Sequence, residues 1–233
     1  MSHDIIGKAF TYTKEGFLGE WKRWIFLLVL VFIQWITLFL VPVFNGYLLR
    51  VAGTNDSAPD VNQFVKLFID GWKILLVVII YMIPVIILGV AFGFLALVPE
   101  LILIASGGTP NIELLFGMLV SLAIIFLVVI LIALFLFMGL IRLGQTGKLS
   151  EAFNFSAING AIDSGVGWLG YIGYCILLWI IVVIYGAVLG LLNAIPDVGL
   201  ILALIIGTII TPLVSVFTTS YLRNIYTAGN TDN

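Results

Sequence analysis

The chain has 233 residues, of which 62% are hydrophobic and 9% are charged, and its formal net charge is −2. A nucleic-acid-binding protein needs a concentrated basic surface, so this balance argues against nucleic acid as a partner. The one cysteine, Cys175, lies in an apolar stretch, which excludes an internal disulfide bond and says nothing of the compartment. The polar stretches are too short to hold a separate soluble domain.

Long blocks without Asp, Glu, Lys, Arg or His dominate the sequence. About 20 apolar residues in a helix cross the hydrocarbon core of a bilayer, whereas helices of soluble proteins need a polar face. We therefore predict an all-α, polytopic transmembrane helix bundle, with residues 1–233 forming a single integral membrane domain. The uncharged blocks are Ile25–Phe44, Ile74–Val98, Leu114–Ile141, Trp168–Leu192 and Leu200–Val216. The expected membrane segments are about 24–49, 74–98, 114–141, 168–192 and 199–221.

Three short amphipathic segments lie between or before these blocks. Their apolar residues recur with helical spacing, aromatic residues are frequent, and a tryptophan follows each segment at the start of the next block. This pattern predicts interfacial amphipathic elbow helices that lie in the headgroup plane and then turn into a membrane span. The alternative is an ordinary loop helix packed against its own bundle. The three segments span residues 5–21, 61–72 and 151–162, with approximate bounds.

Arginine follows a small residue and apolar residues at three helix exits, in Gly46–Arg50, Gly139–Arg142 and Ser220–Arg223. The recurrence divides the chain into three units, each an interfacial helix followed by a membrane crossing. Internal repeats of this kind are common in membrane proteins.

Glycine and proline mark further positions within the blocks. The pairs Gly89/Gly93 and Gly186/Gly190 match the close-packing motif of membrane helices, and we expect them to serve contacts inside the bundle rather than dimerisation. Prolines remove a backbone donor and kink or break a helix. They stand in or beside apolar blocks at positions Pro42, Pro84, Pro196 and Pro212.

The distribution of Lys and Arg predicts the topology. Segments 99–113 and 193–199 carry neither residue, so the positive-inside rule places both segments outside the cell and both termini in the cytoplasm. We therefore expect a multi-pass protein of the cell membrane. Five full spans violate the rule, because the N-terminus and the basic segment after the first block then face opposite sides. A hairpin or re-entrant pair, broken near Gln34 to Pro42, removes the conflict. A plain first span with a violated charge rule is the alternative.

Residues capable of catalysis or metal binding are sparse. The blocks contain no ionisable acid or base of the kind that marks proton or ion relays. The only histidine is His3, so zinc sites and Ser/His catalysis have no support. Glu100 and Glu113 could chelate a cation but are better explained as solvated loop charges. We predict that the protein is not an enzyme and has no catalytic, cofactor-binding or metal-binding residues, and no cofactor.

Charged residues near the block ends are expected to stabilise helix ends. Asp70, Asp163, Arg50 and Arg142 could meet at the cytoplasmic ends of the bundle as ion pairs.

Several stretches resemble the domain-of-unknown-function family 4013, a group of multi-pass membrane proteins frequent in archaea. They are Gly46-Tyr47-Leu48-Leu49-Arg50, Pro59-Asp60, Leu67-Phe68-Ile69-Asp70-Gly71-Trp72-Lys73, Tyr81-Met82-Ile83-Pro84, Glu151-Ala152-Phe153 and Tyr221-Leu222-Arg223-Asn224-Ile225-Tyr226. The resemblance implies the architecture and a cell membrane, and no activity. The chain is also distantly similar to the membrane portion of some glycerophosphodiester phosphodiesterases, from which no catalytic residue carries over.

Two functions remain open. Interfacial helices, dense aromatics and blocks without charge favour a noncatalytic module that binds membrane lipids or protein partners. The hydroxyls of Thr208, Thr211 and Ser215, which recur on one face of the last block, favour an uncoupled channel or transporter for a small solute. Hydrogen bonds between helices would explain the same hydroxyls. Protein partners and the oligomeric state are not determined by the sequence.

Single cysteines placed in the connecting segments test the predicted topology. In a background without Cys175, Thr109→Cys should react with an impermeant maleimide on intact cells, whereas Asn62→Cys and Thr146→Cys should react only after permeabilisation. Labelling of Asn62→Cys from outside would contradict the hairpin and restore a plain first span.

Overall fold

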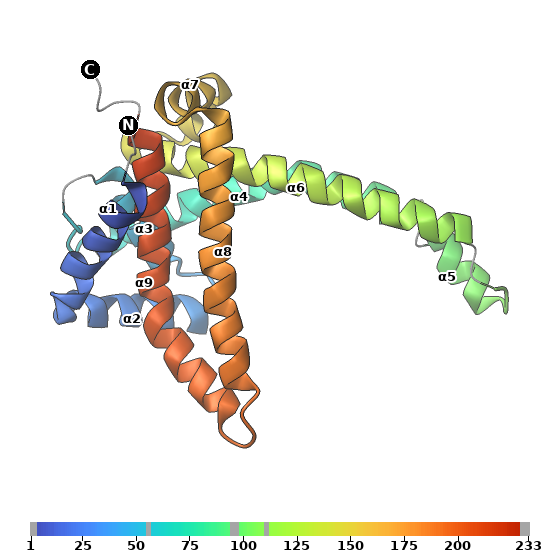
Figure 1. Ribbon diagram of the computed structural model, residues 1–233, viewed down its shortest axis with the longest axis horizontal. Coiled ribbons are helices and arrows are strands. Elements are labelled where there is room, and N and C mark those ends of the chain that lie inside the picture. The colour runs from blue at the N-terminus through green and yellow to red at the C-terminus, as the bar shows by residue number, and fades with distance from the viewer. Residues whose placement is uncertain (1–3, 55–56, 94–97, 110–111, 229–233) are drawn as a thin grey trace. The chain divides into compact units, whose positions relative to one another are not determined.

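The structure, a computed structural model, describes residues 4–54, 57–93, 98–109 and 112–228, and these residues form helices joined by short turns (Figure 1). No strand occurs among them. The elements are α1 (Ile5–Thr13), the π-helical turn η1 (Lys14–Leu18), α2 (Trp21–Ile36), α3 (Val43–Gly53), α4 (Phe64–Phe92), α5 (Val98–Ala105), α6 (Ile112–Thr146), the 3₁₀ turn η3 (Leu149–Phe153), α7 (Phe155–Gly165), α8 (Gly167–Asn193) and α9 (Gly199–Thr227). The predicted all-α class is confirmed.

Two compact units divide the chain. The first comprises Met1–Leu75 and Phe137–Asn233, and the second comprises Leu76–Leu136. The second unit therefore holds most of α4, all of α5 and most of α6. Because α4 and α6 each belong to both units, this division does not test the expectation of a single integral membrane domain.

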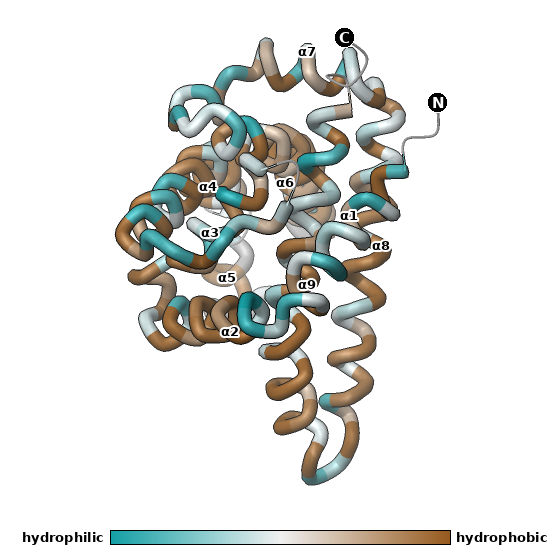
Figure 2. The backbone as a smooth tube through the Cα atoms, turned by 90° about the vertical axis from the view of Figure 1, so that its left-hand side faces the viewer, coloured by the Kyte–Doolittle hydropathy of each residue, from teal (hydrophilic) through white to brown (hydrophobic). Residues whose placement is uncertain are grey.

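Within the first unit, α8 and α9 form an antiparallel hairpin, and α1 packs along α9 (Figure 1). Both hairpin helices are apolar over most of their length, as the brown tube in Figure 2 shows. Large side chains such as Leu169, Trp179 and Leu204 are exposed on them. Water would oppose this exposure, whereas hydrocarbon tails accept it, so the hairpin surface suits a bilayer.

Among the described residues, four helices are long and apolar enough to cross a membrane by length and composition: α4, residues 116–146 of α6, α8 and α9. These helices overlap the last four expected membrane segments, although α4 begins at Phe64 and residues 94–97 of the expected segment 74–98 lie outside the described residues. The first expected segment contributes no such helix, because it is divided between α2 and α3.

The division of the first block has a local cause. The chain turns at Leu38 and Phe39, whose φ angles are 48° and 64°. Pro42 follows, and proline lacks an N–H and disfavours a helical residue before it, so one helix does not continue through this point. The buried Gln34 then closes the turn. Its Nε2 donates to Asn45 Oδ1 at 3.2 Å, and its Oε1 accepts from the Asn45 backbone N–H at 3.1 Å.

The break near Gln34 to Pro42 is thus confirmed, and a plain first span in one unbroken helix is wrong. Figure 1 shows α2 running across the α8–α9 hairpin rather than along it. The depth at which α2 and α3 lie in a bilayer stays a prediction.

Two of the three expected elbow segments form separate helices. α1 and η1 end at a bend at Gly19 and Glu20 before α2 begins. α7 ends at Gly165, Val166 lies between it and α8, and Gly167 at the start of α8 has a φ of 67°, which glycine adopts without strain. Their position in a headgroup plane stays a prediction.

The third expected elbow, over Val61–Trp72, is wrong as a separate element. α4 begins at Phe64 and continues without interruption to Phe92. No proline lies between Phe64 and Trp72, and the one glycine there, Gly71, costs a helix only about 1 kcal/mol relative to alanine. An amphipathic start followed by an apolar block therefore marks a change of surroundings along one helix.

α3 contacts α4 through backbone rather than through side chains. A Cβ atom added to Gly46 would collide with the carbonyl group of Leu67, and one added to Gly71 would collide with the carbonyl group of Pro42. Only residues without a side chain allow two backbones to approach this closely. Both glycines stand in the stretches that resemble family 4013, so the close crossing explains why these positions carry glycine.

Alanine substitutions test the crossing. Gly46→Ala should destabilise the protein by about 1–3 kcal/mol, because the added methyl group forces α3 and α4 apart. Gly89→Ala is the matched control, since a Cβ there meets nothing within 4 Å, and it should be neutral or slightly stabilising. Thermal unfolding in detergent measures both variants. A Gly46→Ala protein as stable as the parent would show that the crossing is loose.

Candidate functional site

Each arginine at a helix exit holds a neighbouring part of the chain. Arg50, in the last turn of α3, donates to Asn62 Oδ1 at 3.0 Å and to the Gln63 carbonyl at 3.3 Å, immediately before α4. The last carbonyls of a helix and the segments that follow need hydrogen-bond partners, and arginine supplies several donors from one side chain. Arg142 and Arg223, near the ends of α6 and α9, also hold other segments, but through different partners.

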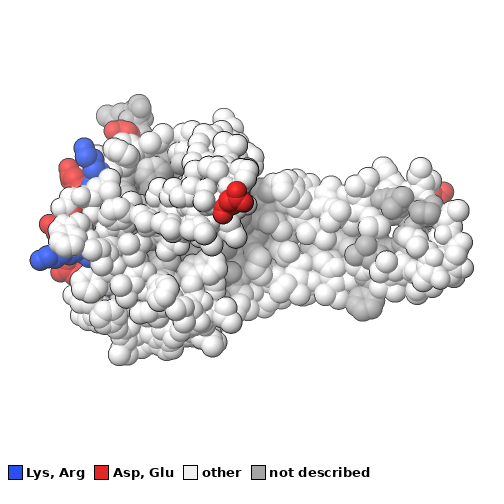
Figure 3. Space-filling view, turned by 90° about the horizontal axis from the view of Figure 1, so that it is seen from below, with Lys and Arg blue, Asp and Glu red and all other residues white. Residues whose placement is uncertain are grey.

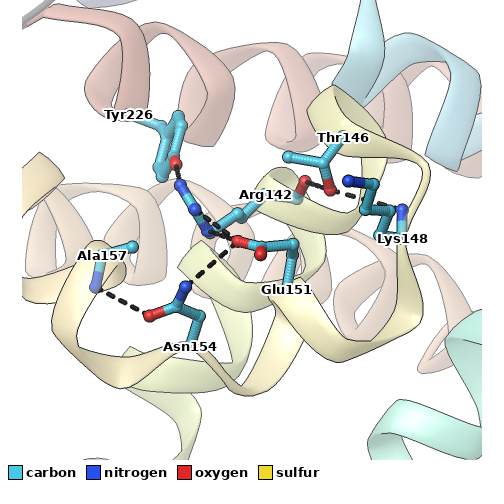
Figure 4. Close-up of polar contacts among 7 residues, drawn as sticks. All are labelled: Arg142, Thr146, Lys148, Glu151, Asn154, Ala157 and Tyr226. Carbon is cyan, nitrogen blue, oxygen red and sulfur yellow. Dashed lines mark hydrogen bonds and ion pairs between the residues drawn. The ribbon is translucent and has the colours of Figure 1, made fainter.

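Arg142 joins α6 to η3 and α9, as Figure 4 shows. Its Nε and Nη2 both donate to Glu151 Oε2, the former at 2.8 Å, and its Nη1 donates to the hydroxyl of Tyr226 at 2.8 Å. Asn154 donates to the same Glu151 oxygen at 3.2 Å and accepts from the Ala157 N–H at 3.1 Å, which caps the start of α7. The Arg142 guanidinium lowers the pKa of the Glu151 carboxyl group.

Arg223 is the most enclosed of the three, with 3% of its surface exposed. Its Nη1 donates to the carbonyls of Val51, at 3.1 Å, and Thr54, and its Nη2 donates to Ser220 Oγ at 2.9 Å. The guanidinium carbon lies 4.5 Å from the centre of the Tyr12 ring. Arg223 thus brings α9, the carboxyl end of α3 and α1 together, where the negative end of the α3 dipole favours a cation.

The ion pairs expected among Asp70, Asp163, Arg50 and Arg142 are wrong. Asp70 instead pairs with Lys73 at 2.7 Å, and Asp163 accepts from the side chain of Asn159. Both partners lie three or four residues away on the same helix. Side chains at that spacing are already neighbours, so a local pair orders less of the chain than a pair between helices.

An apolar groove, which we name the α1 groove, is lined by residues of α1, η1, α8 and α9. Its volume is about 310 Å³, within the range of small-ligand sites. The lining residues are Phe10, Thr13, Lys14, Leu18, Ile181, Tyr185, Leu213, Val214 and Phe217. Thr13 donates to the Ala9 carbonyl, and Tyr185 shares a 2.8 Å hydrogen bond with Thr211 Oγ1, so both hydroxyls are already engaged.

A second apolar groove, the α2 groove, lies between α2 and the hairpin and has a volume of about 340 Å³. The lining residues are Val31, Phe32, Trp35, Leu189, Ala203, Leu204, Gly207, Thr208 and Thr211. Near it, Trp24 Nε1 donates to the Ile209 carbonyl at 3.2 Å, which holds α2 against α9 close to Pro212. Aromatic side chains of α2 thus form one wall and small residues of α9 form the other.

The hydroxyl face of α9 is largely occupied by contacts within the protein. Thr211 bonds to Tyr185, and Ser215 donates to the Thr211 carbonyl at 2.9 Å. Thr208 is exposed in the α2 groove. The Thr211 bond therefore joins α9 to α8, whereas the Ser215 bond stays within α9, and Thr208 and Thr211 add polarity to one groove wall.

The expectation that both glycine pairs pack inside the bundle is wrong. A Cβ added to Gly89, Gly93, Gly186 or Gly190 would meet nothing within 4 Å. In the second unit, Gly89 and Gly93 instead border a third apolar groove of about 330 Å³, the α4–α6 groove. Its other lining residues are Phe92, Met118, Ser121, Leu122 and Ile125.

Over the part of the chain that the structure describes, no group of three or more His, Cys, Asp or Glu residues could hold a metal ion. His3 lies outside that part, and so does the side chain of Glu100. Glu113 stands in the first turn of α6.

Sequence reasoning singled out the arginines but not the grooves. Phe10, Lys14 and Leu18 recur at intervals of four residues, which places them along one face and could have indicated one wall of the α1 groove. The opposite wall is made by α8 and α9, some 170 to 200 residues further along the chain. No local pattern relates the two walls.

Four long apolar helices and broad apolar surfaces make this chain a multi-pass α-helical membrane protein. The family model described as "Protein of unknown function (DUF4013)" matches residues 29–194, more than half of the chain, and the chain belongs to that family. The match begins midway through α2 and ends just after α8. It leaves out α1 and α9, and with α9 the Tyr221–Tyr226 stretch. No curated protein and no solved structure matches the chain.

Acidification should weaken the Arg142 joint. Because the pKa of Glu151 is lowered in the folded protein, the pair contributes stability above the ordinary glutamate pKa of about 4.5 and loses it as the pH falls through the lowered value. The melting temperature of the parent should therefore exceed that of Glu151→Gln at pH 7, and the difference should shrink below pH 4.5. Glu20→Gln, at an exposed position, is the control. A difference that does not depend on pH would contradict this role.

Proposed function

We propose that this membrane protein is a noncatalytic module that binds membrane lipids, with acyl chains lying in the grooves beside the α8–α9 hairpin. The α1 and α2 grooves carry the proposal. Both lie on helices suited to a bilayer, and their walls are mostly apolar, with few polar groups left to bind a solute. Burial of an acyl chain there would be favourable by about 0.8 kcal/mol for each methylene group removed from water, and far less when the chain comes from the bilayer.

We place the protein in the cell membrane with both termini in the cytoplasm. The distribution of Lys and Arg supports this orientation. Asn224 near the end of α9 donates to the Ile5 carbonyl at the start of α1, so the first and last described helices meet. An even number of crossings is consistent with such a meeting.

An uncoupled channel or transporter is the second candidate, because Thr208 and Thr211 border the α2 groove. A conduit needs a continuous polar path across the bilayer. The hydrogen bonds of Thr211 and Ser215 within the hairpin favour a structural role for those hydroxyls, which weakens this candidate.

Native mass spectrometry of the protein extracted in a mild detergent tests lipid binding. The parent should retain more lipid than an unrelated multi-pass protein of similar size. Ala203→Phe fills the α2 groove and should reduce retention several-fold. Ala187→Phe adds the same group at an exposed position of α8 outside the grooves and should retain lipid as the parent does.

Retention equal to that of the unrelated protein would overturn the proposal. Dye-filled proteoliposomes separate the second candidate, since a lipid-binding module should not accelerate dye release. Release that the parent accelerates and Ala203→Phe abolishes would favour a channel instead.

A further inference from the structure

The α1 groove differs from the α2 groove in having a charged residue among its lining residues. Lys14 is the first residue of η1 and is exposed at the edge of the groove. Its neighbours on the same wall, Phe10 and Leu18, are exposed apolar residues. The wall therefore combines an apolar surface for a hydrocarbon chain with a cation on a flexible stem.

Lys14 is available to a ligand. It makes no ion pair and no side-chain hydrogen bond with another residue in the described ranges, whereas Arg23, Lys73 and Arg142 are each engaged with a carboxylate. The hydroxyls of Thr13 and Tyr185 in the groove are satisfied within the protein. Glu15 follows Lys14 in the chain but does not line the groove. The polar end of a ligand in this groove would thus meet an ammonium group.

The surroundings fit a site near a membrane surface. Figure 3 shows basic and acidic side chains gathered at the left-hand edge of the visible face, on the side where Figure 1 labels α1 and α2. Trp21 is exposed there, and tryptophan is enriched at the level of lipid headgroups. A lysine at this level extends its stem along apolar surface and keeps its ammonium group in the polar layer.

We infer that the α1 groove binds an anionic glycerophospholipid, whose acyl chain lies between η1 and the hairpin and whose phosphate contacts the ammonium group of Lys14. This inference rests on the proposed lipid-binding function and adds a preference for headgroup charge. The site includes Phe10, Lys14 and Phe217, which lie outside the residues that the family model matches. A positive charge near a lipid surface contributes about 1 kcal/mol toward an anionic lipid, which corresponds to a preference of about fivefold.

The test compares dioleoylphosphatidylglycerol with dioleoylphosphatidylcholine, which share their acyl chains and differ in net charge. The purified protein is equilibrated with an equimolar mixture in detergent, and the bound lipids are counted by native mass spectrometry. The parent should retain the anionic lipid about fivefold over the zwitterionic one. Lys14→Gln should lose this preference while retaining a similar total amount of lipid, and Lys14→Arg should keep it.

Lys8→Gln is the matched control, because Lys8 is an exposed lysine of α1 that does not line the groove. It should keep the preference. Equal retention of both lipids by the parent, or equal loss of preference in Lys8→Gln and Lys14→Gln, would overturn the inference and leave the proposed function in place. Failure of the parent to retain either lipid would overturn the proposed function itself.

Discussion

Backbone hydrogen bonding at helix ends is the constraint on which this structure depends. Most of the chain is apolar, and a bilayer offers no water to the free N–H and C=O groups where a helix starts or stops. The protein meets this need with a few polar side chains. Gln34 caps the start of α3, Arg223 caps its end, and Arg142 links the exit of α6 to η3 and α9. The contacts of Arg142 with Tyr226 and of Arg223 with Val51 also join elements that lie far apart in the sequence.

The short helix α3 shows how these caps determine packing. Its two ends are held by side chains from α2 and α9, and its middle touches α4 at Gly46 without intervening side chains. Such a helix would be marginal in isolation, because 11 residues are too few for stability in water. Its surroundings hold it in place. The arrangement also orients α2 across the hairpin, and this orientation creates the α2 groove.

The grooves result from the small number of helices that pack against the hairpin. A hairpin flanked by shorter helices leaves apolar surface that the chain itself does not cover. In a membrane, lipid tails cover such surface at little cost. A groove that also presents an unengaged lysine adds a reason to prefer one lipid over another, which is the basis of the inferred anionic-lipid site.

The sequence by itself determined the helical class, the membrane environment and the break in the first block. The first two depend on local composition, because uncharged runs of about 20 residues require a hydrocarbon solvent. Pro42 follows the break in the first block, whereas Pro84 and Pro212 lie inside α4 and α9, so the sequence alone does not show which proline ends a helix. The amphipathic pattern over Val61–Trp72 led to the wrong prediction of a separate helix. Amphipathicity indicates the surroundings of a segment and not where a helix ends. The expected pairing of Arg50 and Arg142 with Asp70 and Asp163 was also wrong. Both aspartates instead contact side chains of their own helices, Lys73 and Asn159.

Only the tertiary structure decided which elements meet. The two walls of the α1 groove, the burial of Arg223 beneath Tyr12 and the contact of Gly46 with Leu67 all join residues from different helices. Helix periodicity shows which face of a helix is apolar, but in a membrane protein nearly every face is apolar, so the pattern does not indicate which face meets another helix and which meets lipid.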